Sequence, residues 1–262
     1  MHKTARITPK SPHSVRVIQC TDTHIPADPA TRFAGIDTDF TLAAVVQAIN
    51  RHTRAPDCVL VTGDLVDIPS ETSYRRLLPY LQAIAAPVYC LPGNHDDPAL
   101  LQAVLNRDTQ RTPKVIEAGP WIIVMLDTWE SGNDGGRLSQ GELETLRRAL
   151  AGAGDRHALV CLHHPPVSIR SPWMDAMALA NPEEFFAVLD QFPNVRGVAW
   201  GHIHQEFESE RNGVLLLGSP STCVQFAPST TEYIVEDRLP GYREFDLGAD
   251  GSVQSRVVRV PV

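Results

Sequence analysis

The sequence lacks several features that would assign it to a special class of protein. No apolar run approaches the length of a membrane-spanning helix, and the first fifteen residues, MHKTARITPKSPHSV, contain no apolar segment typical of a signal peptide. There is no CxxC pair. Four of the five cysteines lie inside apolar, strand-like runs: Cys20, Cys58, Cys90 and Cys161. We therefore expect buried, reduced thiols and a cytoplasmic location.

Positive charge is also scarce, which bears on the kind of partner. The 262 residues include 23 Lys and Arg against 31 Asp and Glu, a formal net charge of −8, and no basic cluster lies near the motifs described below. This balance disfavours a broad surface that follows nucleic-acid phosphates. We expect a small-molecule substrate, with no nucleic acid and no membrane as partner, and the oligomeric state stays open.

A repeated pattern of short apolar runs that end in Asp, Asn or His dominates the sequence. The runs VRVIQC, CVLVT, VYCLP, ALVCL and VRGVAW have strand length, and residues 38–52 and 71–85 show helical apolar spacing, with Pro79 as a bend or break in the second. This alternation predicts an α/β fold with ligands on loops at strand ends. After residue 205, Asn-Gly, Pro-Gly and Asp-Gly turns predict antiparallel strands. We expect one domain over residues 1–262, with residues 1–14 as a flexible tail.

The polar residues at the strand ends predict a metal site. In WGHIHQE, two histidines one residue apart would point to the same face of an extended segment, and the other strand ends add carboxylates, an amide and two more imidazoles. The candidate metal ligands are Asp22, His24, Asp64, Asn94, His163, His202 and His204. Oxygen and nitrogen ligands without thiolate suit Mn, Fe, Zn or Co. Seven ligands are too many for one such ion and fit two, as in two-metal sites that act on phosphate esters.

The charge of such a site favours an anionic substrate. Two divalent ions would bring four positive charges, and Asp22 and Asp64 would cancel two of them. A hydroxide and one phosphodiester anion would balance the rest.

The order of these motifs resembles that of the calcineurin-like metallophosphoesterases. The motifs are Asp22-Thr-His24, Gly63-Asp64, Gly93-Asn94-His95-Asp96, His163-His164-Pro165 and Gly201-His202-Ile203-His204. The resemblance covers about residues 15–225 and implies a four-layer α/β/β/α sandwich with two mixed sheets. QCTDTHIP, LPGNHDD, WGHIHQE, SPSTCVQFAP and PGYREFDL look most like bacterial class III cyclic-nucleotide phosphodiesterases, which implies hydrolysis of 3′,5′-cyclic AMP to 5′-AMP.

The resemblance also implies which residues hold each metal. Ligands of the first ion would be Asp22, His24 and His204, ligands of the second Asn94, His163 and His202, and Asp64 would bridge them. The family's V-x-x-H pattern is met by Val160–His163, which implies His163 as the ligand, with His164 behind it or in the pocket wall.

The implied chemistry is attack by a metal-bridging hydroxide, in line with the departing ribose 3′-oxygen. His95 would stabilise or protonate that oxygen as the catalytic residue, and Asp67 would orient His95. Substrate contacts are expected from His24, Asn94, His95 and His204.

Several alternatives remain open. The substrate could be another small diester such as a glycerophosphodiester. The negative net charge argues against a nuclease, and the complete set of candidate ligands argues against a non-catalytic, nucleotide-binding member of the family. A phosphatase that acts on protein substrates fits less well, because the sequence shows no long insertion that could dock such a substrate. Asp127 is either a loop cap or a support for the site, and Asp96 and Asp97 are typical turn and N-cap residues. The aromatic residues Trp129, Trp173 and Phe226 either wall a base pocket or serve packing.

Overall fold

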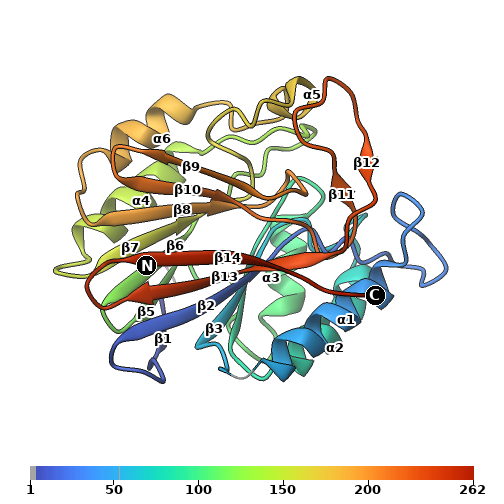
Figure 1. Cartoon of the computed structure of the whole chain (residues 1–262), viewed down its shortest axis with the longest axis horizontal. Helices are drawn as coiled ribbons and strands as arrows, with labels where there is room; N and C mark the ends of the chain where they lie inside the picture. Colours follow the sequence, from blue (N-terminus) through green and yellow to red (C-terminus); the bar gives the residue numbers. More distant parts are fainter. Residues whose placement is uncertain (1–3, 53) are drawn as a thin grey trace.

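Two stacked β-sheets form the centre of the molecule (Figure 1). The computed structural model describes residues 4–52 and 54–262. The first sheet has seven strands in the order β1 (Thr4–Ile7), β5 (Val115–Ala118), β6 (Trp121–Met125), β7 (His157–Cys161), β8 (Val195–Trp200), β10 (Val214–Gly218) and β9 (Phe207–Arg211). The second has five, in the order β14 (Val253–Arg259), β13 (Gly241–Gly248), β2 (Ser14–Cys20), β3 (Cys58–Thr62) and β4 (Val88–Leu91). Both sheets contain parallel and antiparallel pairs, as the resemblance implied.

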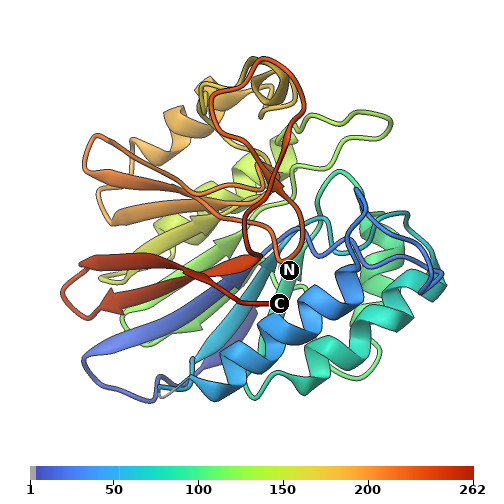
Figure 2. The ribbon, with the colours of Figure 1, turned by 45° about the vertical axis from the view of Figure 1, so that its right-hand side comes forward.

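Helices cover the two outer faces of this pair of sheets (Figure 2). The five-stranded sheet carries α1 (Thr38–Arg51), α2 (Glu71–Ala83) and α3 (Pro98–Leu105). The seven-stranded sheet carries α4 (Gln140–Ala151), α5 (Pro172–Asp175) and α6 (Pro182–Leu189). A separate hairpin joins β11 (Gln225–Phe226) to β12 (Val235–Glu236).

Three buried clusters separate these layers. Between the sheets, Val17 and Leu60 pack with Ile123 and Leu159, and all four side chains are fully buried. A second cluster joins the five-stranded sheet to α1–α3, and a third joins the seven-stranded sheet to α4–α6. Strands buried on both faces need continuous apolar sequence, which is why the runs noted above do not alternate. The four-layer α/β/β/α sandwich is therefore confirmed.

The N-terminal segment and the second helix differ from the predictions. Residues 4–7, predicted as part of a flexible tail, form the parallel edge strand β1, and Ala5 and Ile7 pack against the cluster between the sheets. Residues 1–3 lie outside the described part of the chain. The helix predicted over 71–85 runs from Glu71 to Ala83, with Pro79 inside it.

Other expectations of local structure are met, except that Pro240-Gly241 lies at the start of β13 and does not join two paired strands. Asn212-Gly213 and Asp250-Gly251 lie in the turns of the antiparallel pairs β9–β10 and β13–β14. All five cysteines are buried and unpaired. Within residues 4–52 and 54–262, no helix combines the length and apolar character needed to cross a membrane.

Candidate metal centre

The predicted ligands lie at one edge of the sandwich, because five parallel strands of the two sheets end there. Asp22, Asp64 and Asn94 follow β2, β3 and β4 in one sheet, and His163 and His202 follow β7 and β8 in the other. The carboxyl ends of parallel strands meet at a common edge, so residues far apart in sequence converge. Six of the seven side chains are almost fully buried, and Asn94 is partly buried.

The first group of side chains consists of Asp22, His24 and His204. The Nε2 atoms of His24 and His204 lie 3.2 Å apart, and Nε2 of His204 is 3.3 Å from Oδ1 of Asp22. Potential donor atoms of the three residues all lie within 4.8 Å of one another. This is the spacing of ligands around one ion, and the group matches the set predicted for the first metal.

A second group surrounds His163. Its Nε2 atom lies 3.3 Å from Oδ2 of Asp64 and 3.1 Å from Oδ1 of Asn94. The same Asp64 oxygen is 3.7 Å from Nε2 of His24. Asp64 therefore stands between the two groups, where a bridging carboxylate would stand.

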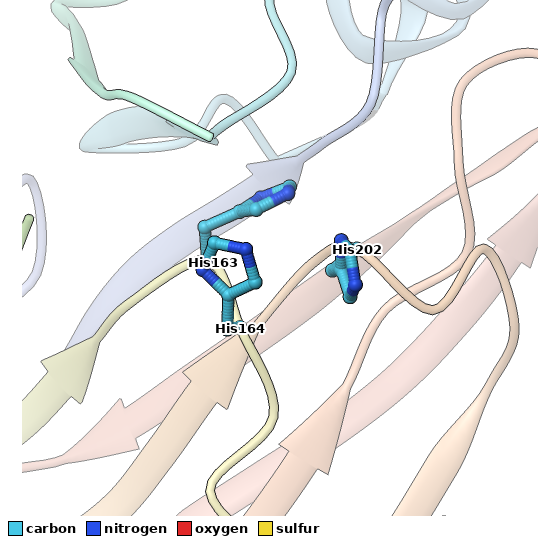
Figure 3. A group of neighbouring side chains, drawn as sticks. All are labelled: His163, His164 and His202. Carbon is cyan, nitrogen blue, oxygen red and sulfur yellow. The ribbon is translucent and has the colours of Figure 1, made fainter. Parts of the chain in front are cut away.

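His202 and His164 complete this side of the site (Figure 3). His163 and His164 come from the loop after β7, and His202 from the loop after β8. The Nε2 atom of His202 is buried without a hydrogen-bond partner among the described residues. Nδ1 of His164 is 2.7 Å from the Thr128 hydroxyl, and its Nε2 donates to the carbonyl of Asp134 at 3.2 Å. Both nitrogens of His164 are thus engaged, which favours His163 as the ligand.

Backbone carbonyls fix the orientation of two imidazoles. Nδ1 of His163 donates to the Thr62 carbonyl at 2.8 Å, and Nδ1 of His204 donates to the Val224 carbonyl at 2.8 Å. A carbonyl only accepts, so each Nδ1 carries a proton, and in the neutral form of each ring the lone pair on Nε2 faces the carboxylates. A lone pair that faces carboxylate oxygens needs a cation or a proton between them. This donor set fits divalent metal ions, and the carbonyl contacts are those typical of metal-binding histidines.

The charges within the site are strongly coupled. Burial by itself lowers the pKa of His163, but the neighbouring carboxylates of Asp64 and Asp22 raise it to about 9. Burial raises the pKa of Asp64, yet His163 and His24 bring it well below its ordinary value. A positive charge among these groups is therefore favoured, whether a proton or a metal ion supplies it.

The backbone is strained at five of the seven predicted ligands. Asp22, His24, Asp64, His202 and His204 have φ angles of 55°, 43°, 49°, 68° and 48°, the left-handed region that residues with a Cβ rarely adopt. Such residues cost about 1–3 kcal/mol each and cluster at functional sites. Their concentration at one edge supports the assignment of this edge as the functional site.

Close packing leaves no room for a side chain at Gly93. A Cβ atom there would lie 2.2 Å from Oδ1 of Asp64 and 2.7 Å from Nε2 of His163. The glycine of the GNHD motif therefore lets the loop after β4 approach the two ligands.

His95 lies beside the metal-ligand group with one nitrogen tied to the backbone. Its Nδ1 donates to the Asp67 carbonyl at 2.8 Å, whereas the Asp67 carboxylate is 3.9 Å away. The sequence predicts that the Asp67 side chain orients His95, but in the structure the main-chain carbonyl of Asp67 makes the hydrogen bond and the carboxylate does not. Burial lowers the pKa of His95, but the Asp64 carboxylate and the Asp67 carbonyl raise it above its ordinary value.

Two further carboxylates hold loops in place. Asp96 is buried and accepts from the amides of Gly93 and Leu65 and from the Tyr74 hydroxyl, which joins the loops after β3 and β4. Asp127 accepts from the amide of Trp129, as a loop cap does.

Two aromatic rings flank the site. Phe33 stacks on His24 with ring centroids 3.9 Å apart, and Phe226 stacks on His204 at 4.2 Å. Sequence reasoning missed Phe33, which lies outside the motifs in an irregular loop, and its only signal was its place between Asp22-Thr-His24 and the following helix. These rings shield the outer faces of both imidazoles and hold them in position.

Comparison with known proteins places this geometry in a family. The calcineurin-like phosphoesterase family matches residues 15–206. The 3′,5′-cyclic adenosine monophosphate phosphodiesterase CpdA of Pseudomonas aeruginosa is 38% identical over 253 residues, 97% of this chain and 93% of that protein. A 3′,5′-cyclic-nucleotide phosphodiesterase of Nostoc sp. is 37% identical over 247 residues, 94% of this chain and 93% of that protein. The crystal structure of a dimetal phosphatase from Danio rerio shares the fold, with a TM-score of 0.60, 14% identity and coverage of 94% of this chain and 99% of that one.

Proposed function

Since the chain belongs to the calcineurin-like phosphoesterase family, we propose that it hydrolyses 3′,5′-cyclic AMP to 5′-AMP at a site that binds two divalent metal ions. The observation that carries this proposal is the convergence of seven residues with nitrogen or oxygen donors at the strand ends of both sheets, with Asp64 between the two groups. The substrate is suggested by the relatives. Two of them are named as cyclic-nucleotide phosphodiesterases, and each aligns with this chain over 93% of its own length.

Each ion would have its own set of protein ligands. Asp22, His24 and His204 would hold the first, and Asn94, His163 and His202 the second, with Asp64 shared. The donor set suits Fe, Mn, Zn or Co. When bound, such a pair lowers the pKa of a coordinated water toward about 7 and neutralises charge that develops on the phosphoryl oxygens.

The protein itself supplies a proton to the leaving group. With Nδ1 of His95 held by the Asp67 carbonyl, Nε2 is the nitrogen free to face the substrate. A protonated Nε2 would hydrogen-bond to the ribose 3′-oxygen and give up its proton as the P–O bond breaks. His24, Asn94 and His204 line the same edge and would also contact the phosphate.

The test is an assay of Mn²⁺-reconstituted protein on 3′,5′-cyclic AMP, with bis(p-nitrophenyl) phosphate in parallel. Turnover of both, lost in Asn94→Ala and kept in the exposed-histidine control His13→Ala, supports the proposal. Turnover of the nitrophenyl diester alone would remove cyclic AMP as the substrate and leave another small diester. Activity on neither substrate with two metals bound would overturn the proposal.

We also propose a cytoplasmic location. Five buried, unpaired thiols suit a reducing compartment, where cysteines stay free. Fractionation of the source cells, with a compartment marker for each fraction, tests this; recovery of the protein outside the cytoplasm would contradict it.

A further inference from the structure

A cavity of about 300 Å³ opens beside the candidate catalytic residue. Asn94 and His95 form one side of it, and Trp129 and Asp134 form another, on the loop between β6 and α4. Ile68, largely exposed, lies at its edge. A volume of this order suits a small-molecule site.

We propose that this cavity binds the nucleoside half of the substrate and that Trp129 stacks against its base, which makes Trp129 a residue that determines specificity. The inference rests on the proposed function and extends it to the part of the substrate that does not react.

The position of His95 gives the direction in which the nucleoside extends. In a 3′,5′-cyclic diester both ester oxygens belong to one ribose, so the leaving oxygen and the base are on the same side of the phosphate. The leaving oxygen would lie at Nε2 of His95, and His95 and Trp129 line the same cavity. The base therefore extends toward the indole ring.

The charge of the walls suits a neutral nucleoside better than a second phosphate. The carboxylates of Asp97 and Asp134 line the cavity, and no Lys or Arg of the described residues does. Ribose hydroxyl and base amino groups are hydrogen-bond donors that carboxylates accept, whereas an additional phosphate would be repelled. The same charge would exclude a polynucleotide strand.

The loop that carries Trp129 is held rigidly against the metal centre. Thr128 and Asp134 both contact the ring of His164, at 2.7 and 3.2 Å, and a Cβ on Gly136 would lie 2.2 Å from Nδ1 of that ring. The amide of Trp129 donates to Asp127 at 2.9 Å. His164 thus positions the loop, and a stacking surface that is fixed in advance loses little entropy on binding.

The other two aromatic candidates, Trp173 and Phe226, are already used in packing, together with Tyr233. Trp173, Phe226 and Tyr233 contact one another edge to face, with centroids 5.1–5.5 Å apart, and the Trp173 indole N–H donates to Thr230. Trp129 is the partly buried tryptophan that lines the cavity with His95.

The experiment compares 3′,5′-cyclic AMP with ribose 3′,5′-cyclic phosphate, which keeps the reacting ester and lacks the base. The wild-type enzyme should prefer cyclic AMP by about tenfold or more in kcat/KM, mainly through KM, as expected for one stacked base. Trp129→Leu should reduce this preference to about twofold or less, and Trp129→Phe should restore most of it. Trp173→Leu is the matched control and should keep the preference.

The outcomes separate the two proposals. Failure of the wild-type enzyme to hydrolyse cyclic AMP would overturn the proposed function and this inference with it. Turnover of cyclic AMP with no preference over the base-free ester, or full preference in a folded Trp129→Leu, would overturn the stacking site and leave the proposed function standing. If Trp129→Leu does not fold, the preference of the wild-type enzyme for cyclic AMP and its value in Trp129→Phe decide whether the stacking site exists. Absence of the preference in the wild-type enzyme would overturn it.

Discussion

Nε2 of His163 lies 3.3 Å from Oδ2 of Asp64, while the other nitrogen of the same ring donates its proton to the Thr62 carbonyl. An unprotonated Nε2 and the Asp64 carboxylate would both present lone pairs and would repel each other, so a positive charge must lie between them. In the metal-free protein that charge is a proton, because the pKa of His163 is raised to about 9. A metal ion must displace this proton when it binds.

Metal affinity should therefore rise with pH. In the folded protein the pKa of His163 is about 9, above the ordinary value of 6.5. Protonation of His163 therefore stabilises the metal-free fold. This contribution is complete below pH 6.5 and is lost as the pH rises through 9. Between these values, apparent affinity should increase about tenfold per pH unit, with release of about one proton per protein. Calorimetry of metal-stripped protein in buffers of different ionisation enthalpy measures this. Affinity independent of pH would contradict it.

Removal of metal should lower the thermal stability. The left-handed backbone at Asp22, His24 and Asp64 and the facing carboxylates are unfavourable without a cation to hold them. Metal at about 100 times its Kd should add about 2.7 kcal/mol to the free energy of unfolding, and Tm should depend on metal concentration. Scanning calorimetry with chelator and then with excess Mn²⁺ tests this. An unchanged Tm would show that the site binds no metal under those conditions.

Gly93→Ala should impair both folding and metal binding. Its Cβ would lie 2.2 Å from the Asp64 carboxylate, so the loop after β4 would have to move, at a cost of about 1–3 kcal/mol. Gly141→Ala, in the first turn of α4, is the matched control: its Cβ would meet nothing closer than 3.6 Å. There alanine should be neutral or stabilising by up to about 1 kcal/mol. Urea unfolding and metal analysis of both variants provide the comparison, and equal stability would refute the close approach.

His95→Ala should reduce kcat by about 10²–10⁴ and leave metal content intact. Asp67→Asn should keep kcat within about threefold of the wild-type value. The main-chain carbonyl of Asp67 orients His95, and the Asp67 carboxylate lies 3.9 Å from Nδ1 of that ring. Steady-state kinetics with metal analysis separates the two roles. Loss of metal in His95→Ala would place His95 among the ligands, and a large loss in Asp67→Asn would give the carboxylate a role.

The sequence was sufficient to single out the candidate ligands because each follows an apolar run. Parallel strands bring their ends together, so Asp22, Asp64, Asn94, His163 and His202 could be expected at one edge before any distance was known. Their roles as ligands stay a prediction, which the geometry favours.

Other features depend on contacts that leave little trace in the local sequence. The Asp67 carbonyl that orients His95 belongs to the main chain, which every residue has. Phe33 stacks on His24 from an irregular loop, and β1 forms only because β5, more than a hundred residues away, offers an edge to pair with. Long-range pairing and ring stacking are set by the folded structure, so residues 4–7 resembled a tail.

Anomalous diffraction from crystals grown with Mn²⁺ would test the central claim most directly. The account predicts two peaks about 3.5–4 Å apart, the usual separation in two-metal sites, with Asp64 in contact with both. It also predicts His163, and not His164, among the ligands. A single peak, or a second ion bound by His164 in place of His163, would contradict the account.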